Sequence, residues 1–572
     1  MTNQQSVAIE SNQRMFYTVV MENENTNNPI AYFCAEFGFD PNIPIYAGGL
    51  GVLSGDTIKE ACDQNVPFIG IGLMYRGYGV VQKIDTDGLQ YEENNLFDPA
   101  VVGLEHVYLD EMPLFIKVHL TELDVWVRVW KKSFSENVTL YLLDTQTDQN
   151  MPTERDITST LYSGTPDTML KQQLILGIGG VKLLNTLGIK PKIYHMNEGR
   201  PNFLHWEVIR ELMRTHEISY QQAKVIAIDK TVYTNHTLVA AGNQNYPVEL
   251  LAMYSEYYAE KMGIDVHELL EDGVTAQAAN QFSVTQAALN TSRTANGVSA
   301  YHTQLSKNTW PQYNWVNITN GVHFPTWQSK SVKDASLDSS ALWHAHLEEK
   351  KKLAEFVKTR TGFSYNPEHM VISWARRLAG YKQFDLLYQD IERLKKIVTS
   401  TEKPVQILMA GKAHSGDTAG KQELQKIIKL MASELPGHAL FIPNYDISVA
   451  QMLTRGSDLW LNTPKMGHEA SGTSGMKAIA NGVINLTIKD GWAKEVNWDR
   501  AGFVLDENNL PLDLYSQLEN NCISLFYDRN SEGMPEQWVK MMQNSIELAE
   551  QFSTKRMLSE YVERLYNGNT KV

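Results

Sequence analysis

The sequence is poor in cysteine, in positive charge and in long apolar runs. Its three cysteines, Cys34, Cys62 and Cys522, match no metal-binding spacing, so we interpret them as reduced thiols. The net charge of −15 argues against nucleic acid or a membrane as a partner, because both require a basic surface. No segment reaches the roughly 18 apolar residues of a membrane span, and no secretory signal is visible at the start. We therefore expect a cytoplasmic protein.

Several catalytic signatures are also missing. The chain has no Ser–His–Asp order, no His-Glu-x-x-His motif and no Cys/His cluster, so we expect no metal site. A carboxylate pair of the kind that glycosidases use remains compatible with the sequence. The 12 Trp and 26 Tyr residues suit sugar rings, although core packing is the commoner use of aromatic side chains.

The length of 572 residues, with 43% hydrophobic and 20% charged residues, indicates a globular protein of two or three domains. From Ala31 onward, short apolar runs alternate with amphipathic stretches, which predicts an α/β chain with parallel sheets. The expected strands are 31–37, 67–75, 192–196, 224–227, 316–319, 370–374, 405–410, 439–442, 458–461 and 482–487. The expected helices include 54–64, 167–187, 201–215, 248–260, 384–398, 420–434 and 535–552.

A polar, charged segment after residue 330 predicts a domain boundary. We expect an N-terminal α/β domain at 1–340 with a small antiparallel insertion at 110–130. A linker helix and loop at 341–364 follow, and then a C-terminal α/β domain at 365–572, whose last helices can return to brace the first domain. Doubly wound sheets bind ligands at the carboxyl ends of their strands, so two facing sheets would line one central cleft.

The segment Glu469–Lys477 holds a carboxylate, three hydroxyl side chains, two glycines and a lysine in nine positions. It lies between an expected strand and an expected helix. This arrangement is typical of an anion-binding turn, because backbone N–H groups and the helix dipole face the anion. Taken alone, a turn of this kind has a purely structural role as often as it binds an anion.

A glycine-rich loop, Ile45–Asp56, precedes the helix expected from Ser54. Gly48, Gly49 and Gly51 allow the backbone to approach an anion or a sugar closely, and Ser54 or Asp56 is the expected N-cap. The spacing matches neither a dinucleotide fingerprint nor a P-loop. A tight turn without a ligand is the alternative.

A basic cluster follows the strand expected at 370–374. Arg376, Arg377 and Lys382 are concentrated in an otherwise acidic protein. Arginine offers a planar fork for phosphate and lysine a compact charge, so the cluster indicates phosphate binding more than a solvated surface.

Polar turns after other expected strands carry His236, Asn296 and the segment 197–200. A single histidine is more often a hydrogen-bonded core residue than a catalytic one. Several such turns together, however, indicate a site for a hydroxyl-rich ligand, because amide, carboxylate and imidazole groups pair well with sugar hydroxyls.

In their order along the chain, these motifs resemble the α-glucan phosphorylases, the family of glycogen, starch and maltodextrin phosphorylase, and especially their shorter bacterial form. The resemblance runs from about residue 31 to residue 492. It implies the glycosyltransferase B fold, with two doubly wound Rossmann-like domains facing a central cleft. The similar segments are 31–37, 48–51, 234–237, 296–297, 319–321, 377–382, 411–413, 444–445 and 469–477.

The resemblance also implies roles for single residues. Pyridoxal 5′-phosphate would be attached to Lys477. The other residues implied to hold the cofactor are Arg376, Thr473, Ser474 and Gly49. Those implied to bind substrate are Gly48, Leu50, Asn296, Ser471, Gly472 and Tyr381. Those implied to be catalytic are Arg377, Lys382, His236 and Glu469.

The implied reaction is the reversible phosphorolysis of the non-reducing end of an α-1,4-glucan to α-glucose 1-phosphate with retention. The cofactor phosphate would relay a proton to inorganic phosphate, which Arg377, Lys382 and the Gly49 backbone would hold. Two neighbouring phosphates repel each other, and cationic side chains offset that repulsion. The implied partners are the glucan and inorganic phosphate. Whether the chain forms a homo-oligomer is left open by the sequence.

Four features depart from the family pattern, namely Arg200, Gln173, Gln383 and the segment Lys465–His468. Because of them, a catalytically weak, glucan-binding relative of these enzymes is one alternative interpretation. A nucleotide-sugar-dependent glucosyltransferase of the same fold is a second alternative, although it would need no lysine at position 477.

Overall fold

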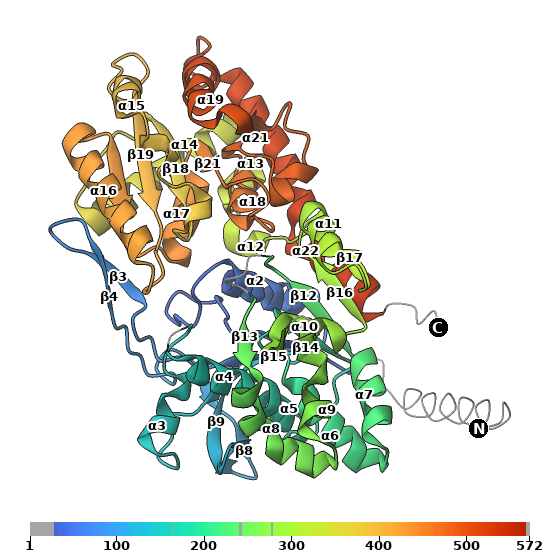
Figure 1. Cartoon of the computed structure of the whole chain (residues 1–572). Coiled ribbons are helices and arrows are strands. Elements are labelled where there is room, and N and C mark those ends of the chain that lie inside the picture. Colours follow the sequence, from blue (N-terminus) through green and yellow to red (C-terminus); the bar gives the residue numbers. More distant parts are fainter. Residues whose placement is uncertain (1–27, 163, 239–242, 276–277, 568–572) are drawn as a thin grey trace.

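Two sheets, one in each half of the chain, organise the molecule (Figure 1). The computed structural model describes residues 28–162, 164–238, 243–275 and 278–567. Both sheets are built mainly from parallel strands with helices between them, which confirms the predicted α/β class. Helix α2 (Gly49–Asp63) and the short helix α12 (Phe324–Trp327) lie where the two halves meet (Figure 1).

The first sheet has ten strands in the order β17-β16-β12-β11-β1-β2-β10-β9-β5, with β8 paired to β9. The strands from β17 to β10 are parallel, and β9 runs antiparallel to β10, β8 and β5. Strands β8 and β9 cover the stretch in which the sequence predicts an antiparallel insertion. The bounds are β1 (Ile30–Phe33), β2 (Phe68–Leu73), β5 (Glu105–His106), β8 (Phe115–Leu120), β9 (Leu123–Ser133), β10 (Val138–Asp144), β11 (Ile193–Asn197), β12 (Thr231–Asn235), β16 (Thr294–Gly297) and β17 (Trp315–Asn317).

The second sheet has six parallel strands in the order β20-β19-β18-β21-β22-β23. Its central strands are buried along their whole length, as expected of a parallel sheet covered by helices on both faces. The bounds are β18 (Met370–Ala375), β19 (Val405–Ala410), β20 (Ala439–Ile442), β21 (Leu459–Asn462), β22 (Ile484–Thr487) and β23 (Gly502–Val504).

Helices pack on both sheets and join them. A cluster of buried side chains that includes Trp327, Met476 and Trp492 contacts residues of both halves, among them Val52 of α2. The helices that follow α2 include α4 (Pro166–Leu174), α5 (Gly180–Thr186), α6 (Leu204–His216), α7 (Tyr220–Asp229), α8 (Val248–Met262), α10 (Val284–Asn290), α11 (Ala300–Thr309), α14 (Ser339–Thr361), α15 (Ile391–Val398), α16 (Thr418–Glu434), α17 (Ile447–Gly456), α18 (Thr473–Ile479), α19 (Leu510–Gln517), α21 (Glu536–Ala549) and α22 (Thr554–Tyr561).

The strand predicted at 224–227 is wrong, because this stretch lies inside helix α7. The side chain of Ser219 accepts from the Gln222 backbone N–H, and the Gln222 side chain accepts from the Ser219 N–H. This capping box was visible in the sequence as Ser-x-x-Gln. The buried Ala223, Ile226 and Ala227 follow with helical spacing.

Two predicted helix starts are also wrong. The helix expected at 384–398 begins at Ile391, where Asp390 caps α15, and short turns precede it. Helix α2 begins at Gly49 with Gly48 as its N-cap. Ser54 and Asp56 therefore lie inside α2 instead of capping it, and the glycine-rich segment forms the first helical turn.

Two segments bear on the domain limits, which stay a prediction. Helix α14, expected to be a linker, packs through Leu342 and Trp343 into the core of the second sheet. The last helices return to the first half of the chain, where Met557 and Leu558 join its core and Thr554 Oγ1 donates to Glu60 Oε2 at 2.7 Å.

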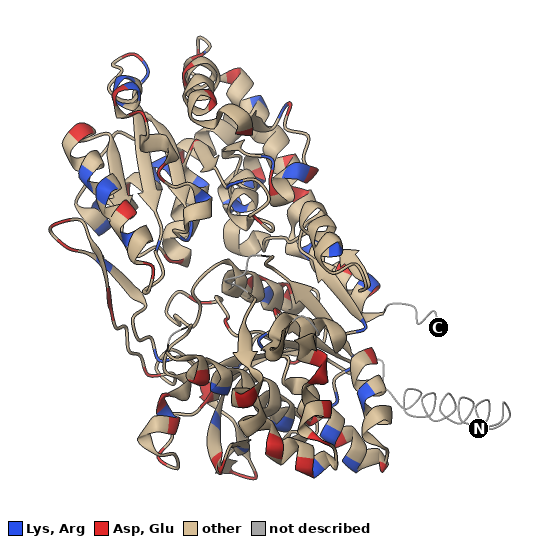
Figure 2. Cartoon of the chain, viewed as in Figure 1, with Lys and Arg blue, Asp and Glu red and all other residues tan. Residues whose placement is uncertain are grey.

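Charged residues of both signs are interspersed along the helices of both halves (Figure 2). Among the residues that the structure describes, no helix has the length and apolar character needed to cross a membrane.

Candidate active site

The predicted site residues of the two halves come together where the carboxyl ends of the two sheets face each other. Gly48, directly before α2, lies close to Arg377, which follows β18. A Cβ built on Gly48 would lie 4.0 Å from Arg377 Cδ. From the end of β16, Ser299 Oγ donates to the Ala470 carbonyl at 2.7 Å. The glycine turn, the basic cluster and the segment 469–477 are therefore neighbours in space.

A buried ion-pair cluster lies at the centre of this region. Arg376 Nη1 donates to Glu469 Oε2 at 2.9 Å, and Lys382 Nζ pairs with the same oxygen. Arg376 also donates through Nη2 to Ser474 Oγ at 2.9 Å. All three charged side chains are at least nine-tenths buried, so the turn and the cationic loop are joined by charge-assisted hydrogen bonds.

Burial and mutual attraction act against each other in this cluster. Burial alone would raise the pKa of Glu469, but Lys382 and Arg376 outweigh it and hold that pKa below its ordinary value. Burial lowers the pKa of Lys382 from 10.5 to about 8, against the attraction of Glu469. At neutral pH, Lys382 is therefore still mainly a cation and Glu469 an anion. The sequence did not predict this pairing, since Glu469 was expected to face a sugar.

Lys477 lies one turn into α18, with its amine 3.7 Å from the centre of the Trp327 ring. Burial lowers the pKa of this amine from 10.5 to about 8, and the carboxylate of Asp56 opposes the shift. Asp56 in turn accepts from Trp327 Nε1 at 2.8 Å and from the His323 backbone N–H at 3.2 Å. A buried lysine of lowered pKa is a good nucleophile toward a carbonyl carbon.

The turn from Ser471 to Ser474 leads directly into helix α18. Gly472 has φ of +89°, and a Cβ on it would lie 3.1 Å from Glu469 Cγ, so glycine is required there. Thr473 is the first residue of α18. Asp490, at the far side, accepts from the Glu469 backbone N–H at 2.9 Å and holds the turn in place.

The sequence prediction missed Glu36, although it lies in one of the motifs. Its Oε2 accepts from the backbone N–H groups of Ala47 and Gly48 at 2.6 and 3.2 Å. A Cβ on Gly51 would lie 2.7 Å from this oxygen. Glu36 therefore orients the start of α2, where Gly49 is exposed and Leu50 half-buried.

His236 follows β12 and is held by its neighbours in a single tautomer. Ser54 Oγ donates to the Leu50 carbonyl, so it accepts from Asn197 Nδ2 at 3.0 Å. Asn197 Oδ1 then faces His236 Nε2 at 2.5 Å, and Nε2 must carry the proton. Burial lowers the pKa of His236 to about 3, so the ring is neutral and Nδ1 is a hydrogen-bond acceptor.

Two other predicted residues come one from each half of the chain, Asn296 from β16 and Tyr381 from the segment after β18. Asn296, at the end of β16, is fully buried, and its Oδ1 accepts from Thr234 Oγ1 at 2.6 Å. Tyr381 is half-buried with its ring stacked on His468, at a centroid distance of 6.2 Å. Glu198, beside Asn197, accepts from the His236 N–H at 2.8 Å, and burial raises its pKa to about 7.

We expect Asn197→Leu to free the ring of His236, because the variant removes the buried hydrogen bond at Nε2. Nitrogen-15 NMR of labelled histidine should show a tautomer mixture for His236 in place of the single Nε2–H form. The matched control is Asn314→Leu, an exposed asparagine before β17. An unchanged tautomer in Asn197→Leu would contradict the assignment.

The positions that depart from the expected pattern have partners of their own. The guanidinium of Arg200 lies 4.4 Å from the Tyr162 ring centre. Gln173 Nε2 donates to Tyr246 Oη at 2.7 Å, and Gln383 has φ of +48°. In the segment Lys465–His468, the Lys465 N–H donates to the Tyr381 carbonyl at 2.7 Å. The Lys465 contact thus joins the altered segment 465–468 to the predicted site residue Tyr381.

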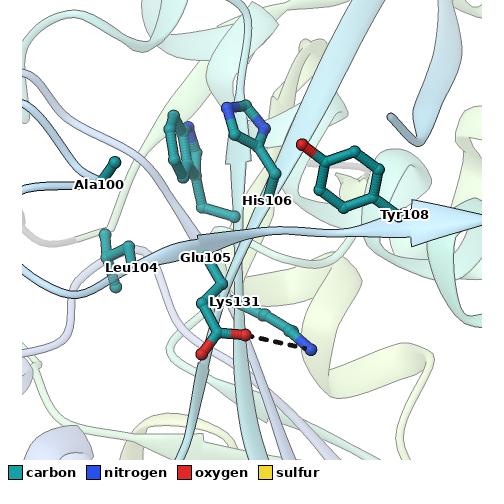
Figure 3. A pocket seen from close by; sticks show the side chains of 7 residues that line it. Ala100, Leu104, Glu105, His106, Tyr108 and Lys131 are labelled. Carbon is teal, nitrogen blue, oxygen red and sulfur yellow. Dashed lines mark ion pairs between the residues drawn. The ribbon is translucent and has the colours of Figure 1, made fainter. Parts of the chain in front are cut away.

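An open recess of about 480 Å³ lies elsewhere, at the β5 edge of the first sheet (Figure 3). The His106 and Trp130 rings lie 3.9 Å apart at a tilt of 34°, Tyr108 lies beside His106, and Glu105 pairs with Lys131 at 3.4 Å. None of the predicted site residues lines this recess.

The chain is similar to known proteins over most of its length. A family model described as carbohydrate phosphorylase matches residues 328–502. The maltodextrin phosphorylase of Thermococcus litoralis is 35% identical over 94% of this chain and 70% of its own length. The chain belongs to the carbohydrate phosphorylase family. Glycogen phosphorylases of Aquifex aeolicus and Mycobacterium tuberculosis are 33% and 32% identical, over 86% and 70% of their lengths.

Family membership confirms the resemblance read from the motifs. The matched residues 328–502 contain strands β18 to β22 and helix α18. They therefore include the basic cluster, Glu469 and Lys477, while the glycine turn, His236 and Asn296 are supplied by the first sheet.

Proposed function

We propose that this member of the family is an α-1,4-glucan phosphorylase, which converts the non-reducing end of a glucan and inorganic phosphate reversibly into α-glucose 1-phosphate with retention. The observation that carries the proposal is the buried cluster of Arg376, Lys382 and Glu469 beside Ser474, one helical turn from the buried amine of Lys477. The names of the relatives, maltodextrin and glycogen phosphorylase, support the same substrate class.

Pyridoxal 5′-phosphate is the proposed cofactor, and the residues present fit it. Within the described chain, Arg376 Nε and Ser471 Oγ are buried without a hydrogen-bond partner, which favours a polar ligand beside them. Lys477 would hold the aldehyde carbon, and Arg376, Thr473 and Ser474 the phosphate. When bound, the cofactor supplies a phosphate group that passes a proton to inorganic phosphate.

The side chains around the cofactor have separate tasks. Arg377, Lys382 and the Gly49 N–H bind inorganic phosphate and offset the repulsion between two neighbouring phosphates. His236 Nδ1 and Asn296 bind hydroxyl groups of the terminal glucosyl unit. Charge that develops on the sugar ring is stabilised by groups already in place, which carries much of catalysis in such sites.

The remaining residues surround the sugar and complete the proposed site. Those that we place around the glucosyl unit are Gly48, Leu50, Tyr381, Glu469, Ser471 and Gly472. We place the reaction in the cytoplasm, because all three cysteines are free and reduced thiols are typical of that compartment.

The direct test is incubation of the purified protein with maltodextrin and inorganic phosphate. Glucose 1-phosphate should form only when both are present, and borohydride should fix the cofactor on the peptide that contains Lys477. A nucleotide-sugar-dependent transferase would instead elongate glucan only when a nucleotide sugar is supplied, and it would release no inorganic phosphate from glucose 1-phosphate. A colourless protein that is inactive with both substrates would overturn the proposal.

The rate at which the apoprotein takes up pyridoxal 5′-phosphate should depend on pH. Only the neutral amine of Lys477 reacts, so the rate should rise about tenfold per pH unit below its pKa and level off above it; that pKa is about 8. Absorbance of the bound cofactor measures the rate. In Asp56→Asn the midpoint should move to lower pH, because the Asp56 carboxylate raises the pKa of Lys477. A midpoint near that of a free lysine would contradict the prediction.

A further inference from the structure

A β-hairpin from the first half of the chain reaches the second sheet. It consists of β3 (Val81–Ile84) and β4 (Gln90–Glu93), and Figure 1 shows it extending upward beside α16. Two glutamines on this hairpin, Gln82 and Gln90, are 1% and 3% exposed. Glutamine is rarely this buried unless its amide is hydrogen-bonded.

Gln82 forms hydrogen bonds with residues that follow β19 and β20 of the second sheet. Its Oε1 accepts from the Asn444 N–H at 2.8 Å, and its own N–H donates to Asn444 Oδ1 at 3.2 Å. Its Nε2 donates to the Gly411 carbonyl at 2.8 Å and to Gln90 Oε1 at 2.7 Å. Both protons and the oxygen of this amide are thus satisfied.

Gln90 binds the next residues of the same loop. Its Oε1 accepts from the Ala413 N–H at 3.1 Å, and its Nε2 donates to the Ala413 carbonyl at 2.9 Å. This is the pairing that a neighbouring strand would make, here supplied by a side chain. Because the Asn444 and Ala413 N–H groups can only donate, the orientation of both amides is determined.

The loop held in this way supports the basic cluster. The Leu378 N–H donates to the Lys412 carbonyl at 2.9 Å, and Leu378 forms a parallel bridge with Ala413. A Cβ on Gly411 would lie 2.3 Å from the Arg376 carbonyl, so the two backbones are in direct contact. The hairpin glutamines are therefore one backbone layer away from Arg376 and Arg377.

Further contacts hold the hairpin on the second sheet. Lys412 Nζ donates to the Val80 carbonyl at 2.8 Å, and Lys421 pairs with Glu92 at 2.8 Å. At the hairpin tip, Gln425 Nε2 donates to the Asp87 carbonyl at 3.1 Å. The contact thus runs along the whole hairpin.

We propose that Gln82 and Gln90 are positioning residues for phosphate binding. They hold the loop 411–413 against the segment 376–378 and so place the guanidinium groups of Arg376 and Arg377. The inference rests on the proposed function for its kinetic consequence, although the docking of the hairpin is independent of any activity.

Replacing either glutamine by leucine removes the side-chain partners of buried backbone groups, which are costly to leave unpaired. In Gln82→Leu and Gln90→Leu we expect KM for phosphate to rise about tenfold, with KM for maltodextrin within about twofold of wild type, because the loop lies under the phosphate side only. The matched control is Lys83→Ala on the same hairpin, whose exposed side chain faces Glu93 at 3.6 Å.

Hydrogen–deuterium exchange gives a readout that does not depend on catalysis. In the wild-type chain the amides of Ala413 and Asn444 should be protected, and in both leucine variants protection should fall in peptides covering 376–382 and 411–414. Protection that is unchanged from wild type in the variants, or an equal rise of KM for phosphate and for maltodextrin, would overturn the proposal. If the wild-type protein forms no glucose 1-phosphate, the proposed function fails, and the exchange experiment still decides the role of the hairpin.

Discussion

Lys477→Ala is expected to lower phosphorolysis by about 100- to 10,000-fold, because the variant would lose the cofactor and with it a general acid–base contribution of that size. Lys477 is the buried amine on α18 that we propose to anchor the cofactor. The variant should also lose the absorbance of bound pyridoxal 5′-phosphate. The measurements are the initial rate of glucose 1-phosphate formation and the visible spectrum of the dialysed protein.

The control is Lys540→Ala, an exposed lysine on α21, which should keep both activity and absorbance. The fold of Lys477→Ala should persist, since removal of a buried amine also removes its desolvation cost. Wild-type activity in Lys477→Ala would show that the covalent anchor lies elsewhere.

Glu469→Gln is expected to destabilise the protein by about 3 kcal/mol, since breaking a buried ion pair leaves its cations unpaired. Arg376 and Lys382 would both lose their common carboxylate. Activity should fall on the order of 100-fold, because the groups around the reacting atoms would no longer be held in place. Inorganic phosphate should raise the Tm of this variant more than that of the wild type, since the anion replaces the missing charge.

The matched control is Glu519→Gln, which breaks the half-exposed pair with Arg393 at 2.7 Å. Such pairs typically contribute about 0.2 to 1 kcal/mol, so Tm should fall much less than in Glu469→Gln and activity should stay near the wild-type value. If the two variants were equally stable, the buried cluster would have no special role in the fold.

Much of the architecture was predictable because it follows from local patterns. Mostly apolar runs of six residues, such as 370–375 and 405–410, are typical of strands in a covered parallel sheet. The strand predicted at 224–227 is wrong because the three apolar residues Val225, Ile226 and Ala227 fit a strand and a helix equally well. There the capping box of Ser219 and Gln222 was the better signal.

The site was predictable in its residue types but not in its pairings. Polar motifs at strand ends, and their order along the chain, predict Lys477, His236 and the basic cluster as site residues, and their roles stay a prediction. They gave no sign that Trp327 lies against Lys477 or that Asn197 determines the tautomer of His236. Neither contact leaves a spacing in the sequence, because each joins separate elements of the fold.

The sequence by itself determined the α/β class, the positions of the polar turns and the family of the protein, since these depend on short periodic patterns and on motifs read in order. Only the tertiary structure decided that Glu469 neutralises Arg376 and Lys382, and that Gln82 ties the hairpin to the loop after β19. These are contacts between residues far apart in the chain. The ion-pair cluster forms when β18 and β21 pair within the second sheet, and the Gln82 contact forms when the hairpin of the first half packs on that sheet.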